Sequence, residues 1–204
     1  MAGKAHWEDV YQTKRPDEVS WFLETATLSL DLIHDAGLRP SDAVIDVGGG
    51  ASRLVDALLD EGFEDLSVLD LSGAALEAAQ ERLGARAERV NWIEADITQV
   101  ELAPERYQLW HDRAVFHFMT TPDQRAAYKR GLTKALRPSG FLIMATFAEN
   151  GPEKCSGLPV QRYSVEALSA ELGADFTLLK SCREAHHTPW GSVQQFIYGL
   201  FKRS

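Results

Sequence analysis

The sequence predicts one α/β domain built around a mostly parallel sheet. Short apolar runs alternate along the chain with segments of helical period, and this pattern is typical of a sheet covered by helices on both faces. The chain has 204 residues, of which 45% are hydrophobic. A chain of this length and composition buries a core of its own. We therefore expect a single domain over residues 1–204.

Five apolar runs are expected to form the parallel part of the sheet. The first run leads into Gly48–Gly50 and then into a helical segment at Ser52–Asp60. Ser72 is a suitable N-cap for the next helix, which extends to Leu83, and Pro122 lies near the start of a helix expected at Gln124–Leu136. The five runs are Ala43–Val47, Leu66–Asp70, Val90–Ile93, Tyr107–His111 and Phe141–Phe147.

The C-terminal quarter departs from this alternation. Residues 149–159 are rich in Gly and Pro and are expected to form a loop. A helix is expected at Ser164–Leu172, followed by two strands at Phe176–Ser181 and Val193–Phe201. The polar stretch between these strands allows them to form a hairpin, which would give the sheet an antiparallel edge.

Two helices are expected ahead of the first strand, at His6–Tyr11 and Val19–Gly37, with a break at Lys14–Pro16. The expected domain therefore has three parts. Residues 1–40 are a helical cover, residues 41–147 are the cofactor-binding core, and residues 148–204 hold an acceptor-side loop, a helix and the last two strands.

Charge and cysteine content exclude several classes of protein. The chain has 21 Lys and Arg against 30 Asp and Glu, and its basic residues form no run, so we expect no nucleic-acid partner. Cys155 and Cys182 have neither disulfide-type nor metal-type spacing, so we expect no metal. No stretch approaches the roughly 18 to 20 apolar residues of a membrane span, and no apolar leader is present. A cytoplasmic protein without a membrane partner is the expectation.

Carboxylates and glycines gather where the predicted parallel strands end. Ligands of open parallel sheets bind beyond the carboxyl ends of the strands. Gly48 and Gly50 allow a ligand to approach the backbone closely, and Asp70 is placed to accept hydrogen bonds from a ribose diol. Asp96 and Ile97 can bracket an adenine, one accepting from its amino group and the other packing on its face. These residues indicate an adenosine-containing cofactor.

The glycine loop favours one adenosine cofactor over another. A dinucleotide fingerprint requires a third glycine where this chain has Arg53, so NAD is disfavoured. Residues Asp46–Ser52 instead resemble the D-x-G-x-G-x-G loop of class I S-adenosylmethionine-dependent methyltransferases, with Ser52 in place of the last glycine. Three further segments resemble motifs of that family in order and spacing. They are Val68–Ser72, Ala95–Ile97 and Leu136–Gly140.

The resemblance implies a Rossmann-like fold with S-adenosyl-L-methionine as cofactor. Gly48 and Gly50 would flank the methionine part of the cofactor, and Asp46 would fix its amino end. Asp70 would hold the ribose, and His111 would face the sulfonium. The expected cofactor-binding residues are Asp46, Gly48, Gly50, Asp70, Leu71, Asp96, Ile97, His111 and Trp21.

The catalytic residues follow from the chemistry of methyl transfer, which is an in-line displacement. Positioning and exclusion of water supply much of the catalysis, and a base is needed only when the nucleophile arrives protonated. His111 and Asp112 are the expected catalytic pair, because they lie at a strand end and histidine titrates near neutral pH. Other candidates for a base or for the pocket wall are His117, His186, His187, Cys155, Trp21, Phe22 and Phe147.

The methyl acceptor is left open by the sequence. The chain has His111–Ala114 where enzymes that methylate the amino groups of bases or glutamine carry N/D-P-P-Y/F, so that class is disfavoured. A small-molecule acceptor, such as a thiol, is expected because the predicted covers are short. Protein lysine is the alternative, since His6–Tyr11 with Ser20–Phe22 is similar to the opening of a set that includes protein lysine methyltransferases. In that set an Asp-Lys pair follows strand four, where this chain has Asp112–Arg113. A non-catalytic module that binds S-adenosylmethionine or a nucleotide is a further alternative.

Overall fold

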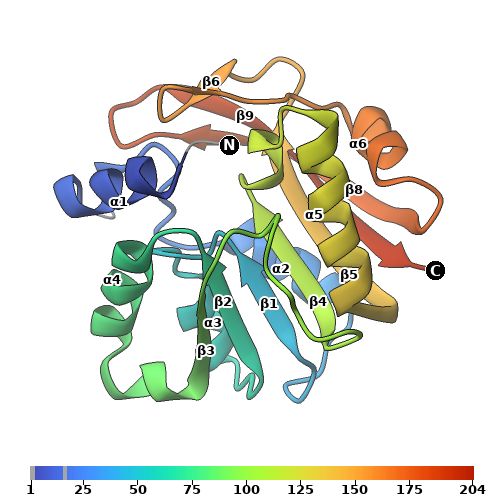
Figure 1. The fold of residues 1–204 in the computed structure, drawn as a ribbon, viewed down its shortest axis with the longest axis horizontal. Coiled ribbons are helices and arrows are strands. Elements are labelled where there is room, and N and C mark those ends of the chain that lie inside the picture. Colours follow the sequence, from blue (N-terminus) through green and yellow to red (C-terminus); the bar gives the residue numbers. More distant parts are fainter. Residues whose placement is uncertain (1–2, 16–17) are drawn as a thin grey trace.

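A seven-stranded sheet forms the centre of the computed structural model, which describes residues 3–15 and 18–204 (Figure 1). The strand order is β3-β2-β1-β4-β5-β9-β8. The strands from β3 to β5 are parallel, and β9 is antiparallel to both β5 and β8. The predicted mostly parallel sheet with an antiparallel edge hairpin is thus confirmed. The strands are β1 (Val44–Val47), β2 (Leu66–Asp70), β3 (Val90–Glu94), β4 (Tyr107–Arg113), β5 (Leu136–Phe147), β8 (Phe176–His187) and β9 (Val193–Arg203).

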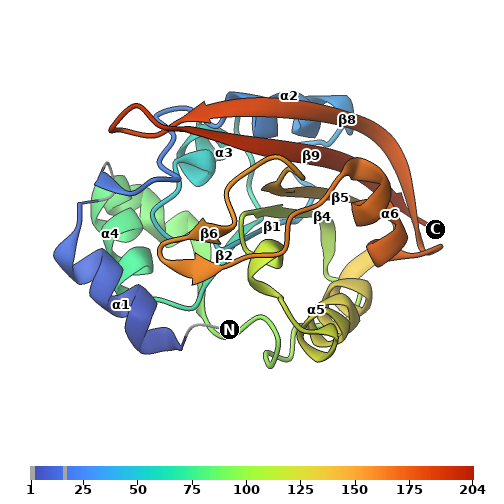
Figure 2. The same ribbon diagram turned by 90° about the horizontal axis from the view of Figure 1, so that it is seen from above.

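Helices cover both faces of the sheet, as Figure 2 shows for α2 and α3 on one side and α5 on the other. Apolar residues of α2, α3 and α4 share one core cluster, and those of α5 and α6 share a second. Helix α1 lies against α4, beyond the carboxyl ends of the parallel strands (Figures 1 and 2). The helices are α1 (Lys4–Thr13), α2 (Thr27–Asp35), α3 (Leu54–Asp60), α4 (Gly73–Leu83), α5 (Pro122–Ala135) and α6 (Val165–Leu172), with 3₁₀ turns η2 (Gly84–Arg89) and η3 (Phe116–Phe118).

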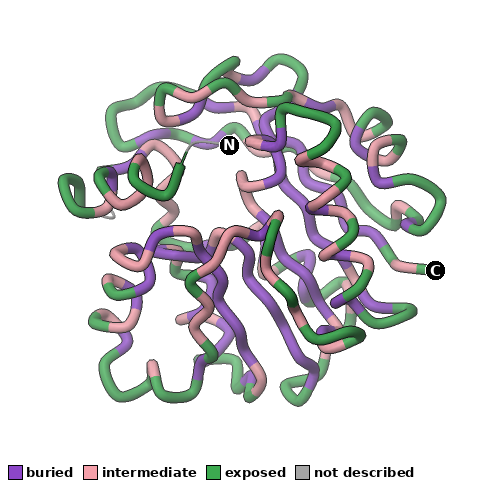
Figure 3. The backbone as a smooth tube through the Cα atoms, in the orientation of Figure 1, coloured by how far each residue is buried: buried purple, intermediate pink, exposed green. Residues whose placement is uncertain are grey.

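Burial on both faces explains why the central strands are apolar runs rather than alternating sequences. Every residue of β1 and β2 is buried, and Figure 3 shows the central strands as the most buried part of the backbone. Local signals fix the helix starts. The hydroxyl of Ser72 accepts from the Ala75 amide at 3.2 Å. Thr121 and Gln124 form a capping box at the start of α5, where Pro122 is the first helical residue. Among the described residues no helix has the length and apolar character needed to cross a membrane.

The predicted helix over Val19–Gly37 is wrong for its first eight residues. The helix begins only at Thr27, and the preceding residues form an irregular segment. In this segment Arg113 binds the carbonyl of Trp21 at 3.0 Å, and His186 binds that of Ser20 at 2.7 Å. Tertiary hydrogen bonds to the main chain therefore replace helical ones. Pro16, part of the predicted break, lies outside the described residues.

Several strand boundaries also differ from prediction. Strand β5 begins at Leu136 rather than Phe141, although Ser139 has a φ of 60°. Strand β8 continues to His187 instead of ending at Ser181, because the polar residues expected to form the connection pair with β9. The expected loop after β5 contains a short hairpin of β6 (Lys154–Cys155) and β7 (Leu158–Pro159). Polar strands with one exposed face resemble loops in composition, so their ends are hard to predict.

Candidate active site

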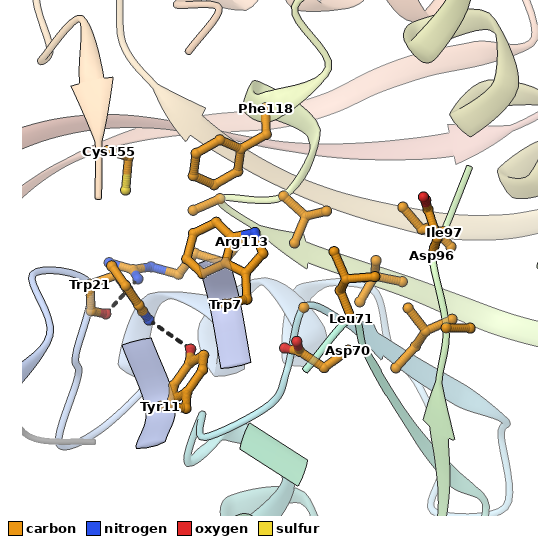
Figure 4. Close-up of a pocket in the computed structure, with 16 residues that line it drawn as sticks. Trp7, Tyr11, Trp21, Asp70, Leu71, Asp96, Ile97, Arg113, Phe118 and Cys155 are labelled. Carbon is orange, nitrogen blue, oxygen red and sulfur yellow. Dashed lines mark hydrogen bonds between the residues drawn. The ribbon is translucent and has the colours of Figure 1, made fainter. Parts of the chain in front are cut away.

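Two pockets lie at the carboxyl ends of the parallel strands. The first, here called the aromatic pocket, is lined by residues that include Trp7, Asp70, Ile97, Arg113, Phe118 and Cys155 (Figure 4). The second, here called the glycine pocket, is lined by residues that include Ser29, Asp46, Gly48, Gly49, Ser52 and His111. Four residues line both pockets, so the two spaces adjoin. These four are Tyr11, Trp21, Gly48 and Arg113.

A buried carboxylate forms the floor of the glycine pocket. The parallel register sets Asp46 of β1 beside His111 of β4, and the Nδ1 atom of His111 lies 2.7 Å from Oδ1 of Asp46. Because a carboxylate only accepts, this nitrogen carries the proton. The other ring nitrogen lies 2.8 Å from the hydroxyl of Ser29. The second carboxylate oxygen of Asp46 is buried and has no partner within the described part of the chain, so it can accept from a bound cation or donor.

Two of the glycines are required for different reasons. Gly48 has a φ of 72°, and a Cβ atom there would lie 2.0 Å from Cγ2 of Val115. Gly50 lines neither pocket. A Cβ atom on Gly50 would lie 2.5 Å from Oδ2 of Asp70 and 2.7 Å from Cβ of Ala75. Gly48 thus shapes the pocket surface, whereas Gly50 allows the loop to pack closely against β2 and α4.

Asp70 and Leu71 form one end of the aromatic pocket. The Asp70 side chain ends β2 and accepts from the Ser72 amide at 2.9 Å. Burial raises the pKa of Asp70 to about 6, while hydrogen bonds from the amides of Ser72, Gly50 and Leu71 limit the increase. Asp70 therefore retains a carboxylate that faces the pocket at neutral pH.

Asp96 and Ile97 line the same end of the aromatic pocket. The carboxylate of Asp96 accepts from the amide of Thr98 at 2.8 Å and from the side-chain amide of Gln99 at 2.9 Å. It therefore fixes the turn after β3 while it lines the pocket. Ile97 is buried and offers an apolar surface there.

Aromatic rings enclose the opposite end of this pocket. Trp7 of α1 makes edge contacts with Trp21 and Phe118, with ring centroids 5.7 Å and 5.2 Å apart. The indole nitrogen of Trp21 donates to the hydroxyl of Tyr11 at 3.1 Å. Figure 4 shows these rings on the side of the pocket away from Asp96 and Ile97.

Arg113, the last residue of β4, adds a buried positive charge at this aromatic end. Its side chain is 10% exposed. Its Nε atom donates to Tyr198 at 2.7 Å, and one Nη atom donates to Glu184 at 3.3 Å. The guanidinium carbon lies 4.5 Å from the ring centroid of Phe196, within the range of a cation–π contact. Side chains of β8 and β9 therefore hold Arg113 in one orientation.

Helix α1 is attached on both sides of the aromatic pocket. Glu8 accepts from the Gly73 and Ala74 amides at 2.7 Å and 3.3 Å, at the start of α4. A ring nitrogen of His6 lies 3.1 Å from the hydroxyl of Ser156, between β6 and β7. A carboxylate at a helix N-terminus is favourable because it satisfies free amides and faces the positive end of the helix dipole. These contacts keep α1 across the pocket.

The structure does not bring the predicted catalytic pair together in either pocket. His111 lines the glycine pocket, but Asp112 lines neither. Asp112 is fully buried and accepts from the Val115 and Phe116 amides at 2.9 Å and 3.1 Å and from the hydroxyl of Tyr128. Successive residues of a strand point to opposite faces of the sheet, so the side chain of Asp112 lies on the other face from those of His111 and Arg113. Asp112 therefore lies outside both pockets, and its catalytic role stays a prediction that this placement does not support.

The other histidines and Cys155 are poorly suited to act as bases. His117 is fully buried, and burial with the nearby charge of Arg113 lowers its pKa to about 3. Burial likewise lowers the pKa of His186, and His187 is exposed. Cys155 does line the aromatic pocket, where burial raises the pKa of its thiol to about 12.

The residues predicted from the sequence to form the pocket walls agree only in part with the residues that line the two pockets. Phe22 lines the glycine pocket as expected, whereas Phe147 is fully buried and lines neither pocket. Ser29, Phe118 and Arg113 were not expected in the site. A usable signal existed for Arg113, because it lies two residues after His111 in a strand and so shares its face.

The strand order and the two acids at the ends of β1 and β2 define this class of protein as a Rossmann-like binder of a nucleoside cofactor. Residues 44–140 match the family model described as "Methyltransferase domain", and the same segment carries the glycine loop and both acidic strand ends. This segment is a methyltransferase domain of the class I S-adenosylmethionine-dependent type, and S-adenosyl-L-methionine is the cofactor of that family.

Known proteins similar to the chain differ in what they act on. The mouse "eEF1A lysine and N-terminal methyltransferase" is 23% identical over 125 residues, which are 61% of this chain and 18% of that protein. The chain thus spans about a fifth of the length of the curated relatives that it matches first.

Two solved structures show the same fold over 98% of this chain, each at 20% identity. One, from work on conversion of a disulfide bond into a thioacetal group during echinomycin biosynthesis, has a TM-score of 0.78 and is covered over 93% of its length. The other, the Burkholderia thailandensis 1,6-didemethyltoxoflavin-N1-methyltransferase with bound 1,6-didemethyltoxoflavin and S-adenosylhomocysteine, has a TM-score of 0.71 and is covered over 84% of its length.

The described residues fit S-adenosyl-L-methionine on their own chemistry. The unpartnered oxygen of Asp46 is a buried acceptor suited to an ammonium group. The carboxylate of Asp70 lines the adjoining pocket, where it suits a ribose diol. Trp21 lines both pockets, and an aromatic face attracts a sulfonium cation.

Proposed function

We infer that the chain transfers the methyl group of S-adenosyl-L-methionine to a small-molecule acceptor bound in the aromatic pocket. The observation that carries this inference is the continuity of that pocket, which runs from Asp70 and Ile97 to the rings beneath α1 (Figure 4). One end suits an adenosine, and the other offers an aromatic compartment for an acceptor. Because α1 is attached on both sides, the compartment suits a small acceptor better than a large one.

In this proposal the cofactor lies across both pockets. Asp46 binds the ammonium group through its free oxygen, beside the surface shaped by Gly48. Asp70 and Leu71 hold the ribose, and Asp96 with Ile97 holds the adenine. The cofactor supplies an electrophilic methyl group, and the surrounding rings exclude water from it.

The predicted residues of β4 take new roles. His111 becomes a positioning residue, because its Nδ1 atom donates to Asp46 at 2.7 Å and so orients that carboxylate. Asp112 becomes a support for η3, whose amides it binds. Gly50 supports the loop rather than contacting the cofactor, because it lines neither pocket.

The proposed setting is the cytoplasm. Both cysteines, Cys155 and Cys182, are free thiols, which is usual in a reducing compartment. The net charge of −9 supports a partner other than nucleic acid.

Calorimetric titration with S-adenosylhomocysteine, with NAD as control, tests the cofactor. A product assay on a panel of thiols, alcohols and amines, and then on a cell lysate, tests the acceptor. We expect binding of S-adenosylhomocysteine, no binding of NAD, and methylation of a small molecule. Methylation of lysate proteins alone would favour a protein lysine acceptor, which the curated relatives' names support. Binding without any turnover would indicate a non-catalytic module.

A further inference from the structure

Arg113 has hydrogen-bonding capacity that the fold leaves unused. A guanidinium carries five N–H groups, and three of them are used, by Tyr198, the Trp21 carbonyl and Glu184. Within residues 3–15 and 18–204, one N–H on each Nη atom is left without a partner. The side chain is nine-tenths buried and lines both pockets. Two buried donors are thus available to a ligand.

The same neighbours make this donor pair rigid. Tyr198 accepts from Arg113 and donates to Glu184 at 2.9 Å, so the three side chains form a closed set. Phe196 lies against the guanidinium. A guanidinium fixed in this way is prepared for an acceptor atom or an anion, and it disfavours a bound ammonium.

The acceptor end of the pocket also offers no described group that takes a proton at neutral pH. Burial raises the pKa of Tyr11 beyond its usual range and that of Cys155 to about 12. His117 lies behind the wall, and burial keeps its ring neutral. Asp70, whose charge acts on Tyr11, is the carboxylate that the proposed function assigns to the ribose, so the bound cofactor occupies it. A nucleophile that must lose a proton during the reaction finds no base here.

We propose that the acceptor is a thiol with an apolar, ring-bearing body, which the free N–H groups of Arg113 bind as the thiolate. This inference rests on the proposed function. An electron pair of the thiolate sulfur forms the new bond to the methyl carbon, and the bond from that carbon to the sulfonium sulfur breaks. Its electron pair stays on the cofactor sulfur, and no proton moves. Anion and sulfonium become two neutral thioethers.

The pKa values of the possible nucleophiles favour a thiol over an alcohol. An ordinary thiol has a pKa near 8.5, and a neighbouring cation lowers an acid's pKa by about 1 to 3 units. Such a thiol is ionised near neutral pH, whereas an aliphatic alcohol is not. Cys155 provides a contrast in the same pocket, because the charge of Arg113 lowers its pKa less than burial raises it, and without a hydrogen bond to Arg113 its thiol stays protonated. Direct contact with the free N–H groups is therefore the requirement.

The test uses three acceptors of one shape: benzyl mercaptan, benzyl alcohol and benzylamine. We expect methylation of the mercaptan at least tenfold faster than of the other two. We expect kcat to rise with pH to a plateau whose midpoint lies at least one unit below the pKa of the free mercaptan, because kcat reports ionisation in the bound complex. In the complex with S-adenosylhomocysteine, bound mercaptan should show the ultraviolet absorption of a thiolate.

Variants assign the effect to Arg113. Arg113→Met should lower kcat/KM for the mercaptan at least tenfold and abolish the thiolate absorption, with S-adenosylhomocysteine affinity within threefold. Arg113→Lys keeps the positive charge but lacks the planar guanidinium with its paired N–H donors. Its kcat/KM for the mercaptan should lie between those of the wild type and Arg113→Met. Arg106→Met is the control, because Arg106 pairs with Asp65 outside both pockets. Since Arg113→Met can fail to fold, the Lys variant and the wild-type pH profile also bear on the inference.

The outcomes separate two kinds of failure. Small-molecule methylation of the amine or alcohol at least as fast as of the mercaptan, or of sulfur-free compounds alone, overturns the thiolate inference but leaves the proposed function. Unchanged thiolate absorption in a folded Arg113→Lys or Arg113→Met variant does the same. Binding of S-adenosylhomocysteine without methylation of any small molecule overturns the proposed function itself.

Discussion

The glycine pocket and the aromatic pocket adjoin, yet they are built in different ways. The carboxylate floor of the glycine pocket comes from neighbouring strands, where the register alone brings Asp46 to His111. The wall of the aromatic pocket combines α1, the segment before α2, η3 and β6, which are far apart in the sequence. The first is fixed by the sheet, and the second depends on packing between covers. We expect substitutions of residues that the sheet positions, such as Gly48 and Asp70, to affect folding and cofactor binding, and substitutions in the covering segments to affect the cover.

The largest expected effect is that of Gly48→Ala in the glycine pocket. A side chain at a φ of 72° is strained, and its Cβ atom would lie 2.0 Å from Val115. Strain and overpacking together should lower the free energy of unfolding by about 2–5 kcal/mol. Urea denaturation measures this. Gly62→Ala is a matched control, since Gly62 has a φ of 85° and open space around it, and it should cost only about 1–2 kcal/mol. Equal losses would show that contact with Val115 is unimportant.

Asp112→Asn sharpens the distinction between support and catalysis. The amide replaces a carboxylate that accepts from two backbone amides and Tyr128, and one of its two ends cannot accept. The free energy of unfolding should fall by about 1–3 kcal/mol, as measured by urea denaturation. Turnover per folded molecule should change less than threefold. A tenfold loss of turnover in fully folded protein would restore Asp112 to the catalytic site.

Asp70→Asn tests the part of the aromatic pocket that the sheet positions. The carboxylate accepts from a diol better than an amide does, so the affinity for S-adenosylhomocysteine should fall by about tenfold, equal to about 1.4 kcal/mol. Calorimetry at pH 7.5 measures the change. An unchanged dissociation constant would remove the ribose assignment.

The same residue predicts a pH dependence with a definite sign. Because the pKa of Asp70 is about 6 in the folded state, protonation should weaken cofactor binding as the pH falls through 6, by up to about tenfold at pH 5. Asp70→Asn should lack this dependence. For the unliganded protein the sign is opposite. Between pH 3.8, the ordinary pKa of an aspartate, and about pH 6, Asp70 binds more protons when folded than when unfolded. Its contribution to stability therefore falls as the pH rises through that window.

Glu8→Gln should have the smallest effect and act only on the aromatic pocket. The amide keeps one acceptor for the amides at the start of α4 and loses the charge that suits the helix dipole. We expect a loss of about 0.5–1 kcal/mol, confined to α1 and the first turn of α4. Hydrogen exchange of those amides measures it, with α5 as the internal reference. Faster exchange throughout the protein would show that α1 is part of the core rather than a cover.

The sheet and its ligand-binding edge were predictable because their signals are local. Apolar runs, a glycine loop and acids at strand ends locate the parallel strands and place Asp46 and Asp70 in adjoining pockets. The error over residues 19–26 has a different origin, since Arg113 and His186 bind carbonyls there from distant strands. No helical periodicity records such a contact.

The region around β4 shows how much a simple rule adds. His111 and Asp112 were both expected in the site, but alternation along a strand points their side chains to opposite faces of the sheet. The rule groups His111 with Arg113, and the structure has this pair lining the glycine pocket. The partners of Arg113, which come from β8 and β9, were beyond prediction because the hairpin's register is set by distant pairing.

The segment before α2 is attached through its main chain, since Arg113 and His186 bind the carbonyls of Trp21 and Ser20. Every residue type supplies a carbonyl, so replacing a side chain here leaves both hydrogen bonds available. A smaller residue at position 21 would remove the ring contacts with Trp7 and Tyr11 but leave the segment attached through its main chain. Position 21 is thus one where the wall of both pockets can change, by engineering or by divergence among relatives, while the backbone stays joined to the sheet.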